Sequence, residues 1–305
     1  MTVTVQVPAS SANLGPAFDC AAIALSLHLR VSATPNSSGK LEIRYHGPDS
    51  ERIALDETNL IARAMRQIAA ASKVKLAGAR IDIDNHIPIG SGLGSSAAAI
   101  IAGTILGADL CGVALDPGKI LRHALALEKH PDNISAALHG GMVVAAIKQD
   151  AADDGEDVFV SATNVSEKLD FIAVTPDVPL PTDKARAVLP AQYSREDAVA
   201  NIQRTALIAA AFFSRGDLAP EMFRDRLHQP YRSPLVPGIA ECLEYRSEGL
   251  AGVFLSGAGS SVMAIAVRKS AQIGKELVEI FRRNGITARA ARFKADNDGA
   301  QVRRA

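Results

Sequence analysis

The sequence has few of the features that mark several common classes of protein. Tryptophan is absent and aromatic residues make up only 4% of the 305 residues, which argues against a surface that stacks nucleobases. The 33 basic and 33 acidic residues give a formal net charge of zero, so no excess of charge indicates binding to nucleic acid or to an anionic membrane. We therefore expect neither as a partner.

Cysteine is equally scarce. Cys20, Cys111 and Cys242 lie far apart without a Cys-x-x-Cys pair, which argues against a disulfide framework or a zinc site and fits a reducing cytoplasm. The longest apolar run, residues 97–108, is shorter than a membrane span. The N-terminus shows no signal-peptide pattern, so we expect a soluble, cytoplasmic protein.

Residues 87–107 combine the strongest local signals. A predicted strand at 80–84 leads into a tight segment in which Gly90, Gly92 and Gly94 alternate, and an apolar run that predicts a buried helix follows at once. Glycines let backbone N–H groups approach a ligand, and a helix N-terminus adds unpaired N–H groups and a positive dipole end. The segment therefore predicts a phosphate cradle, with a plain glycine-rich turn as the alternative.

Two familiar nucleotide-binding loops do not fit this segment. A Walker A loop needs a Gly-Lys-Ser/Thr sequence, and no lysine lies between Lys75 and Lys119. A dinucleotide fingerprint needs a third glycine at the position of Ser95. Both of these classes are thus excluded by single residues.

Periodicity predicts the remaining elements. The first strand is expected at a sheet edge and is expected to end at Pro8, before an irregular loop that runs to Asp19, and the next two strands are expected to be antiparallel. Strands are predicted at 3–7, 21–33, 41–45, 80–84, 142–147, 169–174, 252–255, 262–267 and 288–293, and helices at 59–71, 97–103, 117–127, 134–138, 198–214, 235–245 and 271–283.

The order of these elements bounds the fold. Strands and helices mix without regular βαβ spacing, which favours an α+β fold over a doubly wound sheet. Residues 149–157 are acidic and polar and are expected to form a solvated hairpin or linker. The chain is long enough for two domains, which we place at 1–160 and 161–305.

Three separated motifs occur in a characteristic order. They are PASSANLGP at 8–16, PIGSGLGSSAA at 88–98 and LSGAGSS at 255–261, and together they resemble the three motifs of the GHMP kinase superfamily. Four further runs resemble its homoserine kinase branch: ANLGPAFD at 12–19, HPDN at 130–133, PTDKAR at 181–186 and HQPYR at 228–232. The resemblance covers nearly the whole chain.

The resemblance implies a two-domain GHMP kinase fold, with an N-terminal ribosomal S5 domain 2-like nucleotide-binding domain and a C-terminal ferredoxin-like α/β sandwich domain. It implies ATP- and Mg²⁺-dependent phosphorylation of the L-homoserine hydroxyl to O-phospho-L-homoserine in threonine biosynthesis, carried out by a homodimer. A GHMP kinase for another small alcohol, such as a mevalonate-type kinase, and a non-catalytic ligand-binding relative are the alternatives.

The same resemblance assigns roles to residues, and their chemistry agrees. Hydroxyl and carboxylate oxygens suit Mg²⁺, and arginine pairs suit a carboxylate. The implied ATP-binding residues are Pro88, Gly90, Ser91, Gly92, Leu93, Gly94, Ser95, Ser96, Gly257 and Gly259, and the implied metal ligands are Ser96 and Glu128. The implied homoserine pocket contains Asn13, Asp19, His130, Asp132, Asn133, Thr182, Arg186 and Arg232. Asn133, Glu128 and Ser96 are the implied catalytic residues.

The general base and the substrate preference stay open at this point. Asn133 would orient the hydroxyl, and proximity to a neutralised phosphate would supply most of the acceleration, while His130 is a candidate acid or base. Ala17 and Lys129 stand where the family usually has glycine, which bears on substrate choice. Inhibition by threonine at the same pocket is a further hypothesis.

Overall fold

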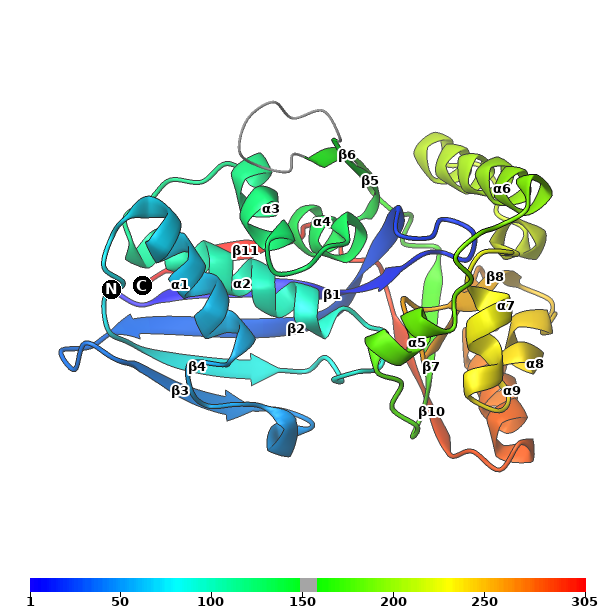
Figure 1. Ribbon diagram of the computed structural model, residues 1–305. Helices are drawn as coiled ribbons and strands as arrows, with labels where there is room; N and C mark the ends of the chain where they lie inside the picture. Colours follow the sequence, from blue (N-terminus) through cyan, green and yellow to red (C-terminus); the bar gives the residue numbers. More distant parts are fainter. Residues whose placement is uncertain (149–157) are drawn as a thin grey trace.

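Two β-sheets organise the chain, and helices pack against each of them (Figure 1). The computed structural model describes residues 1–148 and 158–305, so the hairpin or linker expected at 149–157 lies outside the described residues. Within these two ranges, one sheet has seven strands and the other has four. The two termini lie side by side, because Thr2 and Ala305 exchange backbone hydrogen bonds (Figure 1).

The seven-stranded sheet is built around β2. The strands lie in the order β11-β1-β2-β4-β3, while β5 pairs with β2 and β6 pairs with β5. Residues 29–35 of β2 pair with β4 and residues 21–23 pair with β5, so one long strand serves both neighbours. The strands are β1 Val3–Ala12, β2 Ala21–Pro35, β3 Leu41–His46, β4 Ala79–Asn85, β5 Met142–Ile147, β6 Val158–Thr163 and β11 Gln301–Arg304.

The structure corrects the prediction for the first strand. β1 continues past Pro8 to Ala12, because residues 9–12 pair with residues 22–25 of β2 after a register shift between Pro8 and Ala9. Proline removes one donor from the ladder, and the irregularity in register falls at that point. β1 also pairs with β11 on its other side, so it is an interior strand and the irregular loop begins only after Ala12.

Two further features of this sheet bear on the predictions: one strand pair is parallel, and the sheet extends beyond the predicted domain boundary at residue 160. β3 pairs in parallel with β4, with Leu41 opposite Ala79. A parallel pair needs a long connection, which helix α1 (Leu60–Ser72) provides. The sheet also extends to Thr163 and takes in residues 301–304. A division of the chain at residue 160 therefore stays a proposal.

Four helices cover one face of this sheet (Figure 1). Side chains cap two of these helices: Asn59 accepts a hydrogen bond from Ile61 N, and Asp116 accepts one from Lys119 N, each satisfying a donor that the first helical turn leaves free. The helices are α1 Leu60–Ser72, α2 Ser95–Leu110, α3 Pro117–Leu125 and α4 Pro131–His139. α4 begins three residues earlier than predicted, which places residues 132 and 133 in its first turn.

Helix α2 continues past Gly103, the residue at which the predicted helix ended. It is apolar all round and buried between α1 and the sheet, as such a helix must be. A Cβ at Gly103 would lie 2.5 Å from the carbonyl oxygen of Ile61. The glycine therefore permits close packing of α1 on α2 instead of ending the helix.

The four-stranded sheet has the order β10-β7-β9-β8, with each neighbouring pair antiparallel. Counted along the chain this is the order 4-1-3-2, the arrangement of a β-α-β-β-α-β unit. The strands are β7 Asp170–Pro176, β8 Leu250–Leu255, β9 Val262–Ala266 and β10 Ala288–Phe293; the helices are α5 Thr182–Ala187, α6 Arg195–Ser214, α7 Gln229–Arg232, α8 Ile239–Glu244 and α9 Ser270–Arg283; and the 3₁₀ helices of the chain are η1 Ser50–Arg52, η2 Pro220–Phe223 and η3 Ser233–Leu235.

One apolar core joins the two sheets. Phe171, Phe254 and Met263 from the four-stranded sheet belong to the same cluster of buried side chains as Leu14 and Leu25 from the other half. The loops between the sheets are therefore held at fixed positions. In the described parts of the chain, no helix has both the length and the apolar character to cross a membrane.

Candidate active site

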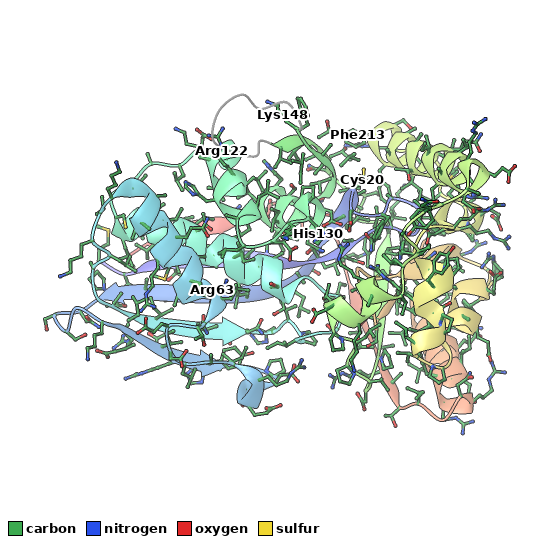
Figure 2. The ribbon with its side chains drawn as sticks, viewed as in Figure 1. Cys20, Arg63, Arg122, His130, Lys148 and Phe213 are labelled. Atoms are coloured by element: carbon green, nitrogen blue, oxygen red, sulfur yellow. The ribbon has the colours of Figure 1, made fainter. Side chains whose placement is uncertain are left out.

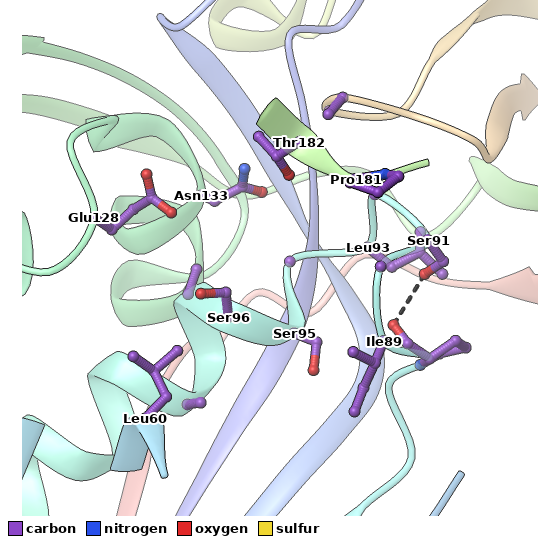
Figure 3. A pocket seen from close by; sticks show the side chains of 18 of the residues that line it. Leu60, Ile89, Ser91, Leu93, Ser95, Ser96, Glu128, Asn133, Pro181 and Thr182 are labelled. Atoms are coloured by element: carbon purple, nitrogen blue, oxygen red, sulfur yellow. Dashed lines mark hydrogen bonds between the residues drawn. The ribbon is translucent and has the colours of Figure 1, made fainter. Parts of the chain in front are cut away.

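A cavity of about 430 Å³ lies where the loops of the two halves meet. Its size is in the usual range for small-molecule sites. Side chains from several elements surround it, among them Ser96 on α2, Asn133 on α4 and Thr182 on α5 (Figure 3). All of the residues that the sequence predicts for the ATP, metal and homoserine sites line this one cavity.

The loop at residues 88–94 is held too tightly for side chains at two of its glycines. Gly92 and Gly94 have φ of 81° and 73°, in the left-handed region that favours glycine. A Cβ at Gly94 would lie 2.1 Å from Oγ of Ser10, and one at Gly92 would lie 2.2 Å from the carbonyl oxygen of Ser256. The loop is thus fixed between β1 and the turn that follows β8.

Helix α2 presents its N-terminus at the end of this loop. Gly94 is the N-cap, and its carbonyl accepts the first intrahelical bond from Ala98 N. The N–H groups of residues 95–97 precede that bond, and glycine has no side chain to cap them. They carry the positive end of the dipole of a 16-residue helix. This end of the cavity is therefore chemically suited to phosphate oxygens.

The turn that contains the third motif lies directly behind the loop. Ser256 Oγ donates to the carbonyl oxygen of Gly92 at 2.7 Å. Ser261 N donates to the carbonyl oxygen of Ser91 at 3.2 Å. The turn therefore supports the loop through these two bonds, whereas a direct contact between the turn and a nucleotide stays a prediction.

A segment that the sequence analysis did not single out holds the start of the loop. Asp49 Oδ2 accepts a hydrogen bond from Ile89 N at 3.0 Å, and Arg52 Nη1 donates to the Ile89 carbonyl oxygen at 3.0 Å. Arg52 also lines the cavity, so it brings a cation to a loop that has no lysine. The segment is short and polar, and no periodic pattern could have found it.

The first turn of α4 contributes two polar groups to the lining of the cavity. Ser10 Oγ donates to Asn133 Oδ1 at 2.7 Å, so Asn133 Nδ2 is left as the donor for another partner. Asp132 Oδ1 accepts from Asn133 N at 2.6 Å. Asp132 is only 2% exposed, and burial, followed by the charge of Asp19, raises its pKa to about 7.

His130 and Glu128 form a hydrogen-bonded pair beside α4. His130 Nδ1 donates to Glu128 Oε1 at 2.7 Å. This bond raises the pKa of His130, while burial acts in the opposite direction. His130 lies at the junction of the two halves of the molecule (Figure 2), and the Glu128 carboxylate points into the space above Ser96 (Figure 3). Oε2 of Glu128 thus stays available for a ligand.

The structure pairs two of the predicted substrate-binding residues with each other. Arg186 Nη1 donates to Asp19 Oδ2 at 3.1 Å, and Arg186 Nη2 donates to Asp19 Oδ1 at 2.8 Å. A forked pair of this kind is among the stronger polar contacts in proteins. A zwitterionic ligand would therefore have to exchange its own charges for these bonds.

Arg232 is buried at the same end of the cavity, with 1% of its surface exposed. Its Nε donates to the carbonyl oxygen of Ala185 at 2.9 Å, and its Nη1 donates to that of Gly257 at 3.2 Å. Burial, followed by the charge of Arg186, lowers the pKa of Arg232 to about 10. The guanidinium therefore stays charged at neutral pH, bonded through these contacts to neutral oxygens.

A buried carboxylate holds the backbone that carries Arg232. Asp225 Oδ2 accepts from the N–H groups of His228 and Gln229 at 2.8 and 2.6 Å, and Asp225 Oδ1 accepts from Asn201 Nδ2 at 2.6 Å. Neither Asp225 nor Asn201 is among the residues that the sequence predicts for the site. Asn201 is a polar residue on the buried face of α6, and Asp225 lies three residues before His228, the N-cap of α7, so neither residue is in a position that a helix-capping pattern indicates.

The fold and the cavity define a phosphotransferase of the GHMP kinase class, because family models for both of its domains match the chain. The GHMP kinases N terminal domain matches residues 59–141, and the GHMP kinases C terminal domain matches residues 206–287. The chain belongs to the homoserine kinase family within this class. The homoserine kinase of Solibacter usitatus (strain Ellin6076) is 39% identical over 302 residues, covering 99% of this chain and 97% of the relative.

Other comparisons agree. The homoserine kinase of Deinococcus radiodurans is 38% identical over 306 residues, covering 99% of this chain and 97% of the relative. Solved structures of a homoserine kinase from Cytophaga hutchinsonii and of a putative homoserine kinase from Listeria monocytogenes superpose with TM-scores of 0.83 and 0.75 at 24% and 27% identity. Each superposition covers 99% of this chain, together with 97% of the Cytophaga hutchinsonii chain and 100% of the Listeria monocytogenes chain. The predicted family and the two-domain α+β fold are confirmed, and a kinase family implies the use of ATP.

Proposed function

We propose that this chain transfers the γ-phosphoryl group of ATP to the hydroxyl of L-homoserine and releases O-phospho-L-homoserine and ADP. One observation carries the proposal: a phosphate loop at one end of a single cavity faces buried Arg232 and the Asp19–Arg186 pair at the other. The names of the relatives support the same reaction. The product would serve threonine biosynthesis.

The polar end of the cavity is complementary to an amino acid. A substrate carboxylate can accept hydrogen bonds from guanidinium groups in fork geometry, which Arg186 and Arg232 offer. A substrate ammonium needs oxygen acceptors, which Asp19 and Asp132 offer. A neutral alcohol or a sugar brings no charge that complements these groups, and it would leave the buried Arg232 with only the bonds to neutral carbonyl oxygens and to His228 that it already has. Loss of complementary polar contacts is a strong means of rejecting an analogue.

The reaction needs the hydroxyl to be held in line with the γ-phosphorus. Asn133 Nδ2 is free of the bond to Ser10 and can donate to the hydroxyl oxygen, which then forms the new O–P bond as the bond to the β–γ bridging oxygen breaks. The hydroxyl proton passes to solvent as that bond forms, so the products are O-phospho-L-homoserine, ADP and a proton. Positioning of this kind supplies a large part of the acceleration in phosphoryl transfer.

The donor set also fits Mg²⁺. Magnesium favours one or two carboxylate or hydroxyl oxygens together with substrate phosphates, and the Ser96 hydroxyl and the Glu128 carboxylate line the same part of the cavity (Figure 3). Bound to the nucleotide there, the ion would neutralise charge on the transferred group. We also propose a homodimer in the cytoplasm, which light scattering and cell fractionation test directly.

A coupled assay of ADP release tests the proposal. Purified protein with MgATP is given homoserine, serine, threonine, mevalonate or shikimate in parallel. We expect homoserine to support the highest kcat/KM by at least tenfold. Turnover with mevalonate but not with homoserine would identify another GHMP kinase activity, and absence of turnover with every alcohol would favour the non-catalytic alternative.

A further inference from the structure

We propose that Phe18 is a positioning residue that holds the guanidinium groups of Arg186 and Arg232 together as one carboxylate site, and that it thereby sets the preference for alcohols that carry a carboxylate. This inference rests on the proposed function, because it concerns the substrate end of the same cavity. Phe18 itself lies behind the arginines and lines no part of the cavity that the ligand would occupy.

The ring contacts both cations. The guanidinium carbon of Arg232 lies 5.1 Å from the centroid of the Phe18 ring, and that of Arg186 lies 5.6 Å from it. Both distances are within the range of cation–π attraction, in which the negative face of the ring stabilises a cation. A half-buried aromatic ring that serves two arginines at once is thus a common support for the pair.

The two guanidinium groups need such a support because they repel each other. Asp19 neutralises Arg186 through two hydrogen bonds, whereas Arg232 is bonded to backbone oxygens and to His228. A buried cation without its own carboxylate is costly. The ring lowers this cost without adding a negative charge, so the positive potential that a substrate carboxylate needs is retained.

The position of Phe18 is fixed from several directions. Its ring stacks on that of His228, with centroids 5.1 Å apart and planes 23° from parallel. His228 Nε2 bonds to the carbonyl oxygen of Gly15 at 2.7 Å, and Asn201 Nδ2 donates to that of Pro16 at 2.9 Å. The second half of the chain thus holds the loop that carries Phe18.

The same loop is strained. Asn13, Leu14 and Asp19 have φ of 74°, 42° and 52°, a region that residues other than glycine seldom adopt. Strain of this kind persists only where the surroundings over-determine the backbone. The loop therefore has a single arrangement, in which Asp19 reaches Arg186 and the Phe18 ring lies against both arginines.

The test compares homoserine with 3-aminopropan-1-ol, the same amino alcohol without its carboxylate. Steady-state kinetics give kcat/KM for both alcohols and KM for ATP, for the wild type, Phe18→Leu and Phe18→Tyr. We expect Phe18→Leu to raise the KM for homoserine about tenfold, which corresponds to about 1.4 kcal/mol. The KM for ATP and the kcat/KM for aminopropanol should stay within twofold, and Phe18→Tyr should keep the wild-type preference.

Two further variants make the test specific. Phe159→Leu removes another ring that contacts a cation, because Lys148 Nζ lies 4.7 Å from the centroid of the Phe159 ring. Lys148 follows the last residue of β5 and lies away from His130 (Figure 2). The kinetics of this variant should therefore match those of the wild type. If Phe18→Leu does not fold, trifluorophenylalanine at position 18 keeps the shape of the ring and weakens its negative face. It should lower the carboxylate preference by at least threefold.

The outcomes separate the two proposals. A wild-type enzyme that does not phosphorylate homoserine would overturn both. A wild type that prefers homoserine, together with a Phe18→Leu or fluorinated variant that keeps this preference within twofold, would overturn the role of Phe18 alone. Equal losses for homoserine, aminopropanol and ATP would also overturn it, because they would show general damage to the fold.

Discussion

Replacing Gly92 by alanine should separate the phosphate loop from the turn that supports it. A Cβ at this position would lie 2.2 Å from the carbonyl oxygen of Ser256 and 2.9 Å from that of Gly259. Both atoms belong to the backbone, so a change of rotamer cannot relieve the overlap. Either the loop or the turn must therefore move.

The size of the effect follows from the bonds at this contact. The left-handed conformation of residue 92 costs a residue other than glycine about 1 to 2 kcal/mol. Movement of the turn would also break the bonds from Ser256 Oγ to Gly92 and from Ser261 N to Ser91, each worth about 1 kcal/mol. We expect the free energy of unfolding to fall by about 3 to 4 kcal/mol.

Gly285 provides a matched control. Its φ is 75°, close to that of Gly92, but a Cβ there would meet no atom within 4 Å. Gly285→Ala should therefore lose only the conformational part, about 1 to 2 kcal/mol. The difference between the two variants isolates the close approach of loop and turn.

Urea unfolding and ATP kinetics measure both consequences. The KM for ATP should rise at least tenfold in Gly92→Ala, because the N–H groups of the loop no longer point at one place, and should stay within twofold in Gly285→Ala. Equal losses of stability in the two variants, with an unchanged KM for ATP in both, would refute the reasoning.

Three acidic residues provide further tests: Asp132 and Glu128 line the cavity, and Asp225 holds the backbone that carries Arg232. Burial raises the pKa of Asp132 to about 7, so between pH 4 and pH 7 the folded protein holds a proton that the unfolded chain releases, and the free energy of unfolding of the wild type should fall by up to about 4 kcal/mol over this range. Urea unfolding at several pH values should show a flatter pH dependence for Asp132→Asn. An unchanged pH dependence would contradict the burial of the Asp132 carboxylate as its cause. Glu128→Gln should lower kcat at least 100-fold with stability unchanged, and normal turnover would remove Glu128 from the metal site. Asp225→Ala should lower the free energy of unfolding by about 3 kcal/mol, because it leaves buried N–H donors unpaired, and it should raise the KM for homoserine. The control Asp298→Ala removes an exposed carboxylate and should change neither the stability nor this KM. Equal effects of the two variants would argue against a positioning role for Asp225.

The sequence predicted best what short-range chemistry decides. The starts of the helices predicted at 59–71 and 117–127 lie within one residue of those observed, because a cap such as Asn59 or Asp116 and the N–H group it binds lie two or three residues apart. The glycines of the phosphate loop were found for the same reason, since their spacing and the following helix are local. The motifs also led to the cavity itself, where all of the proposed site residues lie.

Partners far apart in the sequence escaped prediction. β1 pairs with β11 across almost the whole chain, and nothing near Pro8 indicates that residues 9–12 continue a ladder. The parallel pairing of β3 with β4 depends on how α1 packs. Which strands pair with each other depends on how side chains are buried in the complete core rather than on the local propensity of each strand.

The same limit applies inside the site. The motifs placed Asp19, Arg186, Glu128 and His130 in one cavity, but they did not show that these side chains pair with each other. A list of charged residues says which ligands are possible. Only the distances say which charges are already neutralised before a ligand arrives.

This distinction leads to a difference between the two ends of the cavity. At the phosphate end, the N–H groups at the start of α2 have no side-chain cap, so an anion adds bonds there without breaking any. At the other end, Asp19 and Arg186 already satisfy each other. A ligand with a carboxylate alone would release Asp19 as an unpaired charge, and a ligand with an ammonium alone would do the same to Arg186. Only a zwitterion replaces both halves of the bond that it breaks, so the ion pair selects for amino acids before Arg232 or the hydroxyl contributes to recognition.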